Sequence, residues 1–149
     1  MSGYDSVSLR PIGVVRNEIT EPGMREWDKV TSDLVIDPDL AECIEGLEEF
    51  SHIIVVFWIH ESGDSFPRKV HPQGRADLPL SGVLSTRAPH RPNPLGLKVV
   101  KLLARRQNLL KVVGLDAIDG SPILDIKPYV PMDSIPDAKY PDWVSKLSK

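Results

Sequence analysis

The stretch that most constrains this chain is Ser81–Gly96, SGVLSTRAPHRPNPLG, which is stiffened by three prolines. Each proline fixes its own φ at about −65° and drives the preceding residue toward extended geometry, so the segment cannot form a helix or a central strand. We expect a rigid loop leaving an apolar strand at Gly82–Ser85. The loop presents four polar side chains, Arg87, His90, Arg91 and Asn93. They are mostly donors and suit a carboxylate, a phosphate or a purine edge, although a solvated surface turn would use the same residues.

Composition limits the class of protein. A chain of 149 residues, 41% of them hydrophobic, suits one domain over residues 1–149, with a core of about 8–131 and a tail over 132–149. Cys43 is the sole cysteine, so no disulfide can form within the chain, and we expect it in the core of a protein from a reducing compartment. The longest apolar run, Ile53–Ile59, is too short to span a bilayer, and Met1–Asp5 lacks a signal-peptide pattern. We therefore expect a soluble, cytoplasmic protein without a membrane partner.

Charge is distributed unevenly along the sequence. The net charge is −3, yet residues 61–111 hold ten basic and three acidic side chains. Such asymmetry favours one face that attracts a polyanion on an otherwise acidic protein, unless the charges scatter over the fold.

β-Branched runs alternate with Pro, Gly and Asp at short spacing, which predicts a mostly β protein. The expected strands are Ser8–Arg16, Leu34–Ile36, a fully buried Ile53–Ile59, Gly82–Ser85, a hairpin of Leu97–Leu103 and Leu110–Leu115, and Ile123–Lys127. One short helix, Leu40–Glu45, should follow the capping Asp37. Five to seven short strands favour a single compact, closed β-barrel with one or two short helices and an extended C-terminal tail. The polar strand ends His60–Glu61, Thr86–Arg87 and Asp125–Tyr129 would line its mouth.

Known cofactor and catalytic motifs are missing from the sequence. The four histidines do not have a metal-ligand spacing, no serine lies in a G-x-S-x-G motif, and there is no G-x-G-x-x-G or Walker loop. We therefore expect no bound metal and no Rossmann cofactor site. A row of acids, Asp116, Asp119, Asp125, Asp133 and Asp137, is opposite in charge to the Arg87 loop.

Four segments carry a family resemblance: IGVVRN at Ile12–Asn17, GLEEFSHIIVVFWIH at Gly46–His60, STRAPHRPNPLGL at Ser85–Leu97 and LDAIDGSPILDIKPYVP at Leu115–Pro131. Together they resemble the TsaA-like, TrmO-type tRNA methyltransferases, over about Pro11–Ala138. The resemblance implies a dimeric β-barrel that binds S-adenosylmethionine without a Rossmann fold. It also implies methylation of N6 of threonylcarbamoyl-adenosine beside the tRNA anticodon. Longer bacterial members carry a C-terminal domain without a counterpart here, so the tRNA would be held by the barrel, a dimer partner or another protein.

The resemblance also implies site residues. Those matching the family's contacts to the methyl donor are His60, Glu61, Arg87, Leu97, Leu115, Asp116, Ile118 and Asp119, with a rougher match at Glu21–Met24. The anionic threonyl group would use spare polar and basic side chains, for which the candidates are His90, Arg91, Asn93, Lys98 and Lys127. Removal of the N6 proton needs an acceptor, with Asp125, Tyr129 and Asp133 left as alternatives.

Two other functions stay open on the sequence alone. The chain could be a non-catalytic module that binds S-adenosylmethionine or a nucleotide. A metal-dependent hydrolase would instead use His60, Glu61, His71 and His90. Binding of S-adenosylmethionine with and without a chelator separates these readings.

Overall fold

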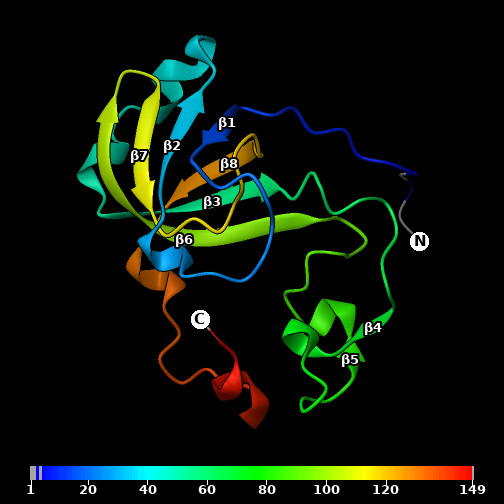
Figure 1. The fold of residues 1–149 in the computed structure, drawn as a ribbon. Helices are drawn as coiled ribbons and strands as arrows, with labels where there is room; N and C mark the ends of the chain where they lie inside the picture. Colours follow the sequence, from blue (N-terminus) through cyan, green and yellow to red (C-terminus); the bar gives the residue numbers. More distant parts are fainter. Residues whose placement is uncertain (1–2, 4, 149) are drawn as a thin grey trace.

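The computed structural model describes residue 3 and residues 5–148. Its centre is a closed barrel of six strands in the order β1-β2-β7-β6-β3-β8, with β8 returning to β1 and every neighbouring pair antiparallel (Figure 1). The predicted mostly β barrel is confirmed. Closure leaves the barrel without an open sheet edge along its six strands.

The barrel strands are β1 Gly13–Arg16, β2 Thr31–Ile36, β3 His52–Trp58, β6 Leu95–Arg106, β7 Leu109–Val113 and β8 Pro122–Pro128. A separate two-stranded sheet pairs β4 Lys69–Val70 with β5 Ser81–Gly82. The helical segments are short 3-10 turns: η1 Trp27–Lys29, η2 Pro38–Ile44, η3 Leu47–Glu49, η4 Pro72–Gly74, η5 Val83–Ser85, η6 Pro131–Asp133 and η7 Asp142–Lys146. No helix in the described part of the chain could cross a membrane.

Alternating side chains of the strands fill the barrel. On β3, Ile53, Val55 and Phe57 point inward and are at most 4% exposed. They pack with inward residues of the other strands, which include Val15, Leu34, Ile36, Val100, Leu110, Val112 and Ile123. Burying a side chain of this kind stabilises the fold by about 1.5–3 kcal/mol, so this cluster holds the barrel together.

The outer side of β3 is also apolar, but it is not fully buried as the sequence predicted. Ile54 and Val56 are half-buried, and Trp58 is 44% exposed. A continuous apolar run therefore does not require burial on both sides. In this barrel strand the outer side chains are partly exposed to solvent.

Local boundaries differ from the prediction where proline or glycine intervenes. Of the predicted strand Gly82–Ser85 only Gly82 belongs to a strand, β5, and the other three residues form η5; the first strand begins at Gly13, after Pro11. The predicted helix is the 3-10 turn η2, where the Asp37 side chain accepts a hydrogen bond from the Asp39 amide. Cys43 on this turn is exposed, so its prediction as a core residue was wrong.

The excursion between β3 and β6 contacts the C-terminal tail. The Gln73 side chain donates to the Ser148 carbonyl (2.7 Å) and accepts from the Ser148 amide (2.9 Å). Arg75 donates to the Lys146 carbonyl and forms a two-point ion pair with Asp77, which holds the pKa of that carboxyl below its usual range. These contacts place the tail, with its turn η7, against the excursion below the barrel (Figure 1).

Candidate functional site

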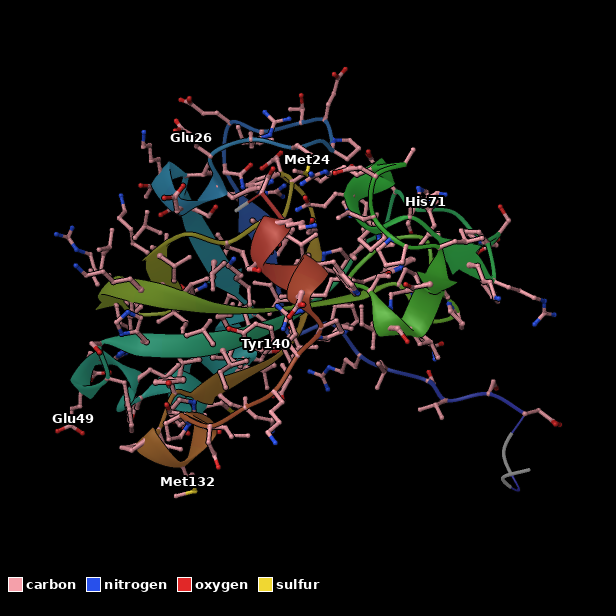
Figure 2. All side chains as sticks on the ribbon, turned by 90° about the horizontal axis from the view of Figure 1, so that it is seen from below. Met24, Glu26, Glu49, His71, Met132 and Tyr140 are labelled. Carbon is pink, nitrogen blue, oxygen red and sulfur yellow. The ribbon has the colours of Figure 1, made fainter. Side chains whose placement is uncertain are left out.

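A cleft of about 980 Å³ opens at the end of the barrel where β3 stops. Four segments line it: the loop 22–27, the end of β3 through residue 62, the segment 84–98, and the loop 116–121. Figure 2 shows Met24 of the first loop beside the excursion that carries His71. Segments far apart in sequence thus meet around one hollow.

Apolar side chains form much of the cleft wall. Phe57 and Ile59 come from β3 and its exit, and Ile118 comes from the opposite loop. Gly96 lies directly against the Phe57 ring, where a Cβ atom would overlap the ring. The close approach of β6 to Phe57 therefore requires glycine at position 96.

Two polar atoms in the cleft wall are buried without a hydrogen-bond partner among the described residues. They are His60 Nδ1 and Ser62 Oγ. Ser62 is only 8% exposed. Because an unpaired buried polar group costs about 1–3 kcal/mol, their position in a cleft indicates a ligand that supplies the missing partners.

The proline-rich loop is held by its own hydrogen bonds. Arg91 Nη1 donates to the carbonyls of Thr86 (3.0 Å) and Ala88 (3.3 Å). His90 Nδ1 donates to the Ser62 carbonyl (2.6 Å), which ties the loop to the exit of β3. Both side chains line the cleft, but each is partly used to fix the loop.

Arg87 differs from Arg91 in this respect. It lines the cleft, is exposed, and makes no hydrogen bond or ion pair with any residue that the structure describes. Pro89, Pro92 and Pro94 stiffen the backbone that follows Arg87, so the guanidinium is presented without anchoring contacts of its own. It is suited to pair with an anionic ligand group.

Lys98 enters the same cleft from β6. Residues 96, 98 and 100 share one side of this strand because side chains alternate, and Val100 on that side is 1% exposed. Lys98 therefore faces the barrel interior, half-buried, at the end where the cleft opens.

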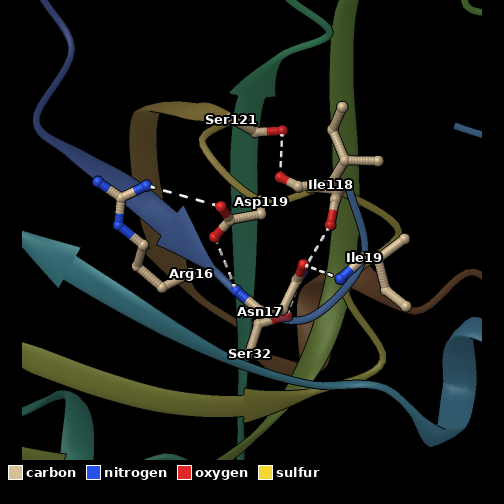
Figure 3. A network of polar contacts seen from close by, with 8 residues as sticks. Arg16, Asn17, Ile19, Ser32, Ile118, Asp119 and Ser121 are labelled. Carbon is tan, nitrogen blue, oxygen red and sulfur yellow. Dashed lines mark hydrogen bonds and ion pairs between the residues drawn. The ribbon is translucent and has the colours of Figure 1, made fainter. Parts of the chain in front are cut away.

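Asn17 fixes the loop 116–121 from behind. Its Nδ2 donates to Ser32 Oγ (3.0 Å) and to the Ala117 carbonyl (2.8 Å), and its Oδ1 accepts from the Ile19 amide (2.9 Å). Figure 3 shows the neighbouring part of this network, where Asp119 accepts from the Asn17 amide (3.1 Å) and lies 3.9 Å from Arg16. One side chain thus joins the end of β1, β2 and the cleft floor.

The structure brings together most of the predicted site residues. Those that line the cleft are His60, Glu61, Arg87, His90, Arg91, Asn93, Leu97, Lys98, Asp116 and Ile118, and the predicted early loop contributes Pro22, Gly23 and Met24. Leu115, which is fully buried in the core, and Asp119, which belongs to the Asn17 network, do not line the cleft.

The predicted proton acceptors lie elsewhere. Tyr129 packs against His52, at the far end of β3 from His60, and the Asp133 carboxylate accepts from the Val130 amide. From His52 to Trp58, β3 advances six residues at about 3.3 Å each, so the end with Tyr129 and the end at the cleft are roughly 20 Å apart. Asp125 forms an ion pair with Lys127 (3.0 Å) and does not line the cleft, nor does Lys127. Within this chain the predicted mouth at Asp125–Tyr129 is therefore not part of the cleft, and the roles of these residues stay predictions.

The four residues of the hydrolase alternative are not gathered at one point. His71 lies outside the cleft lining, with its Nδ1 2.8 Å from the Leu78 carbonyl. Over residues 3 and 5–148 no group of three or more His, Cys, Asp or Glu side chains is placed to hold a metal ion.

Sequence reasoning missed Ser62, Phe57 and Asn17 as parts of the site. The sequence does not single out Ser62, because only the fold shows that its hydroxyl is buried and unpaired in the cleft wall. Asn17 does end the strand motif IGVVRN, and a polar side chain at the end of a predicted strand is a signal that could have been used.

The chain is similar to a described family and to several known proteins. Residues 20–134 match the family described as the tRNA-methyltransferase O N-terminal domain. A "Probable S-adenosyl-L-methionine-binding protein" of Methanothermobacter thermautotrophicus is 43% identical over 127 residues, covering 83% of this chain and 90% of that protein. A mouse "tRNA (adenine(37)-N6)-methyltransferase" is 41% identical over 130 residues, covering 86% of this chain and 30% of that protein.

The fold is shared with a solved structure. A crystal structure of TrmO from Pseudomonas aeruginosa aligns with a TM-score of 0.75 at 35% identity, over 93% of this chain and 62% of that one. The chain thus spans less than two thirds of the solved TrmO chain, but nine tenths of the archaeal relative.

Proposed function

Because this chain belongs to the family of tRNA-methyltransferase O N-terminal domains, we propose that it transfers a methyl group from S-adenosylmethionine to tRNA. The family resemblance predicted from the sequence is thereby confirmed. The observation that carries the proposal is the cleft. It is lined by two buried polar atoms without hydrogen-bond partners among the described residues, His60 Nδ1 and Ser62 Oγ, and by Arg87 on the proline-rich loop. Names of relatives that refer to S-adenosylmethionine and to tRNA adenine support the same reaction.

The residues of the cleft fit S-adenosylmethionine. The adenine ring and the aliphatic carbons of the methionine chain need apolar walls, which Phe57, Ile59 and Ile118 supply. His60 and Ser62 offer the unpaired polar atoms to the ligand's heteroatoms, and Arg87 offers a charge-assisted pair to its carboxylate. This fit requires no metal ion.

The substrate that we propose is threonylcarbamoyl-adenosine beside the anticodon. When bound, S-adenosylmethionine supplies an electrophilic methyl group: the bond from N6 to the methyl carbon forms as the carbon–sulfur bond breaks, and the N6 proton leaves. The protein's main contribution is to hold both reactants in line within the cleft. Glu61 and Asp116 are the carboxylates that line it, so we place the proton transfer at one of them.

We further propose that the protein is a homodimer. The outer side of β3 and β6 carries a row of apolar side chains whose strand partners lie side by side, Trp58 beside Leu95, Val56 beside Leu97 and Ile54 beside Val99. Leu97 is 62% exposed. Contiguous apolar surface of this kind favours an interface, and a second copy would cover it symmetrically. Sedimentation of a monomer at micromolar concentration would remove the proposal, whereas a dimer dissociated by Leu97→Asp would support it.

The tail is a second candidate for this interface. Tyr140 is 65% exposed, and Trp143 and Val130 are half-buried.

We place the protein in the cytoplasm, where a tRNA-modifying enzyme meets its substrate. Fluorescence microscopy of the tagged full chain tests the location.

The proposed function has a two-part test. Calorimetry should detect binding of S-adenosylmethionine that a chelator leaves unchanged, whereas loss of binding in chelator would favour a metal-dependent reading. Labelled methyl groups should then enter tRNA that carries threonylcarbamoyl-adenosine and should not enter unmodified transcript. Binding without transfer to either RNA would leave only a binding module.

A further inference from the structure

Among the described residues, three lysine or arginine side chains line the cleft, and the structure separates their roles. One guanidinium nitrogen of Arg91 donates hydrogen bonds to the Thr86 and Ala88 carbonyls, so this side chain stabilises the loop. Arg87 is exposed at the loop surface. Lys98 is half-buried on the inner side of β6, and it makes no hydrogen bond or ion pair with the residues that the structure describes.

An inward-facing ammonium without a partner is an unfavourable arrangement for the free protein. Partial burial costs hydration of the charge, and a compact ammonium loses more of it than a guanidinium does. An anionic ligand group at the same place would restore the lost interactions as a charge-assisted hydrogen bond. The position of Lys98 therefore indicates an anion that enters the cleft with the ligand.

We infer that Lys98 is the residue that recognises the carboxylate of the modified adenosine, and that it makes the enzyme select the anionic nucleoside. This inference rests on the proposed function. Two carboxylates meet in the cleft during that reaction, one on the methyl donor and one on the threonyl group. Both Arg87 and Lys98 lack a partner among the described residues, but Arg87 is exposed and stays hydrated without a ligand, whereas Lys98 is half-buried. We therefore assign Lys98 to the threonyl carboxylate and leave Arg87 for the carboxylate of the donor.

Equilibrium binding of two synthetic anticodon stem-loops tests the inference. One carries threonylcarbamoyl-adenosine, and the other carries the methyl ester of its carboxylate, so the two RNAs differ by a single charge. The wild-type protein should prefer the acid by about ten- to hundredfold, the scale of a charge-assisted hydrogen bond. Lys98→Met should bring the ratio of the two dissociation constants close to one, while Lys98→Arg should keep most of the preference.

Lys111→Met is the matched control, because Lys111 is an exposed lysine on β7 that does not line the cleft. It should leave the ratio unchanged. Calorimetry should give the same affinity for S-adenosylmethionine in Lys98→Met as in the wild type. A Lys98→Met protein that retains the preference, or one whose donor affinity falls instead, overturns the inference, as does a wild-type ratio near one.

The binding measurement decides the role of Lys98 whether or not methyl transfer occurs. A preference for the acid that depends on Lys98, without any transfer of label, would support the inference and count against the proposed function. Transfer of label at equal efficiency to acid and ester would support the methyltransferase and overturn the inference.

Discussion

Replacing Asn17 with alanine should destabilise the barrel and loosen the cleft together. The side chain makes three hydrogen bonds, to Ser32 Oγ, the Ala117 carbonyl and the Ile19 amide. At about 1 kcal/mol for each bond, the free energy of unfolding should fall by about 3 kcal/mol. Ser32 and Ala117 are 1% and 2% exposed, so water cannot readily replace the lost partner.

Urea unfolding of the variant measures this loss, and Asn108→Ala is the matched control. Asn108 is also half-buried, but its side chain makes one hydrogen bond, to the Ile36 carbonyl (2.7 Å), which predicts a loss of about 1 kcal/mol. Asn17→Ala should also weaken binding of S-adenosylmethionine, because Ala117 and Ile118 lie in the cleft floor. Equal losses of stability in the two variants, with ligand affinity unchanged in both, would refute this reasoning.

Three further predictions concern single residues. Arg87→Ala should weaken the binding free energy of S-adenosylmethionine, measured by calorimetry, by about 1–3 kcal/mol. The Tm should not change, since Arg87 has no partner within the described chain. A lower Tm with normal affinity would show that the arginine has a structural role. Gly96→Ala should lower the free energy of urea unfolding by about 1–3 kcal/mol, because the added Cβ overlaps the Phe57 ring. Gly82→Ala is the control and should leave the free energy unchanged, since its Cβ would meet only the distant Ser85 hydroxyl. Similar losses in the two variants would argue against the overlap. Hydrogen bonds from Arg105 lower the pKa of Glu48 to about 2 from 4.5, so Glu48 stabilises the fold above pH 4.5 and this contribution is lost as the pH falls through 2. Glu48→Gln should therefore flatten the pH dependence of the free energy of urea unfolding over this window. An unchanged pH dependence would contradict the assignment.

The sequence predicted the barrel because its strands depend on local patterns. Ile53, Val55 and Phe57 alternate with outward side chains, and the glycine and aspartate at residues 119–120 mark a turn in which Gly120 adopts a φ of 83°. Boundaries were less accurate near proline and glycine: the first strand begins only at Gly13, two residues after Pro11, and in Gly82–Ser85 the strand ends at Gly82 and a 3-10 turn follows.

The site was predictable only in part, since tertiary contacts assign the roles. The polar loop around Arg87 was evident from its prolines, yet only the fold shows that Arg91 and His90 are partly occupied by backbone carbonyls. Likewise, sequence order places Asp125 and Tyr129 just after the loop 115–119, whereas the direction of β8 carries them away from the cleft.

Mass spectrometry of tRNA nucleosides, from cells with and without the gene for this protein, tests the central claim most directly. We predict that threonylcarbamoyl-adenosine bearing one additional methyl group disappears when the gene is removed and returns when the wild-type gene is restored, but not when the Arg87→Ala form is. An unchanged amount of the methylated nucleoside in cells that lack the gene and any homologue of it would contradict the account.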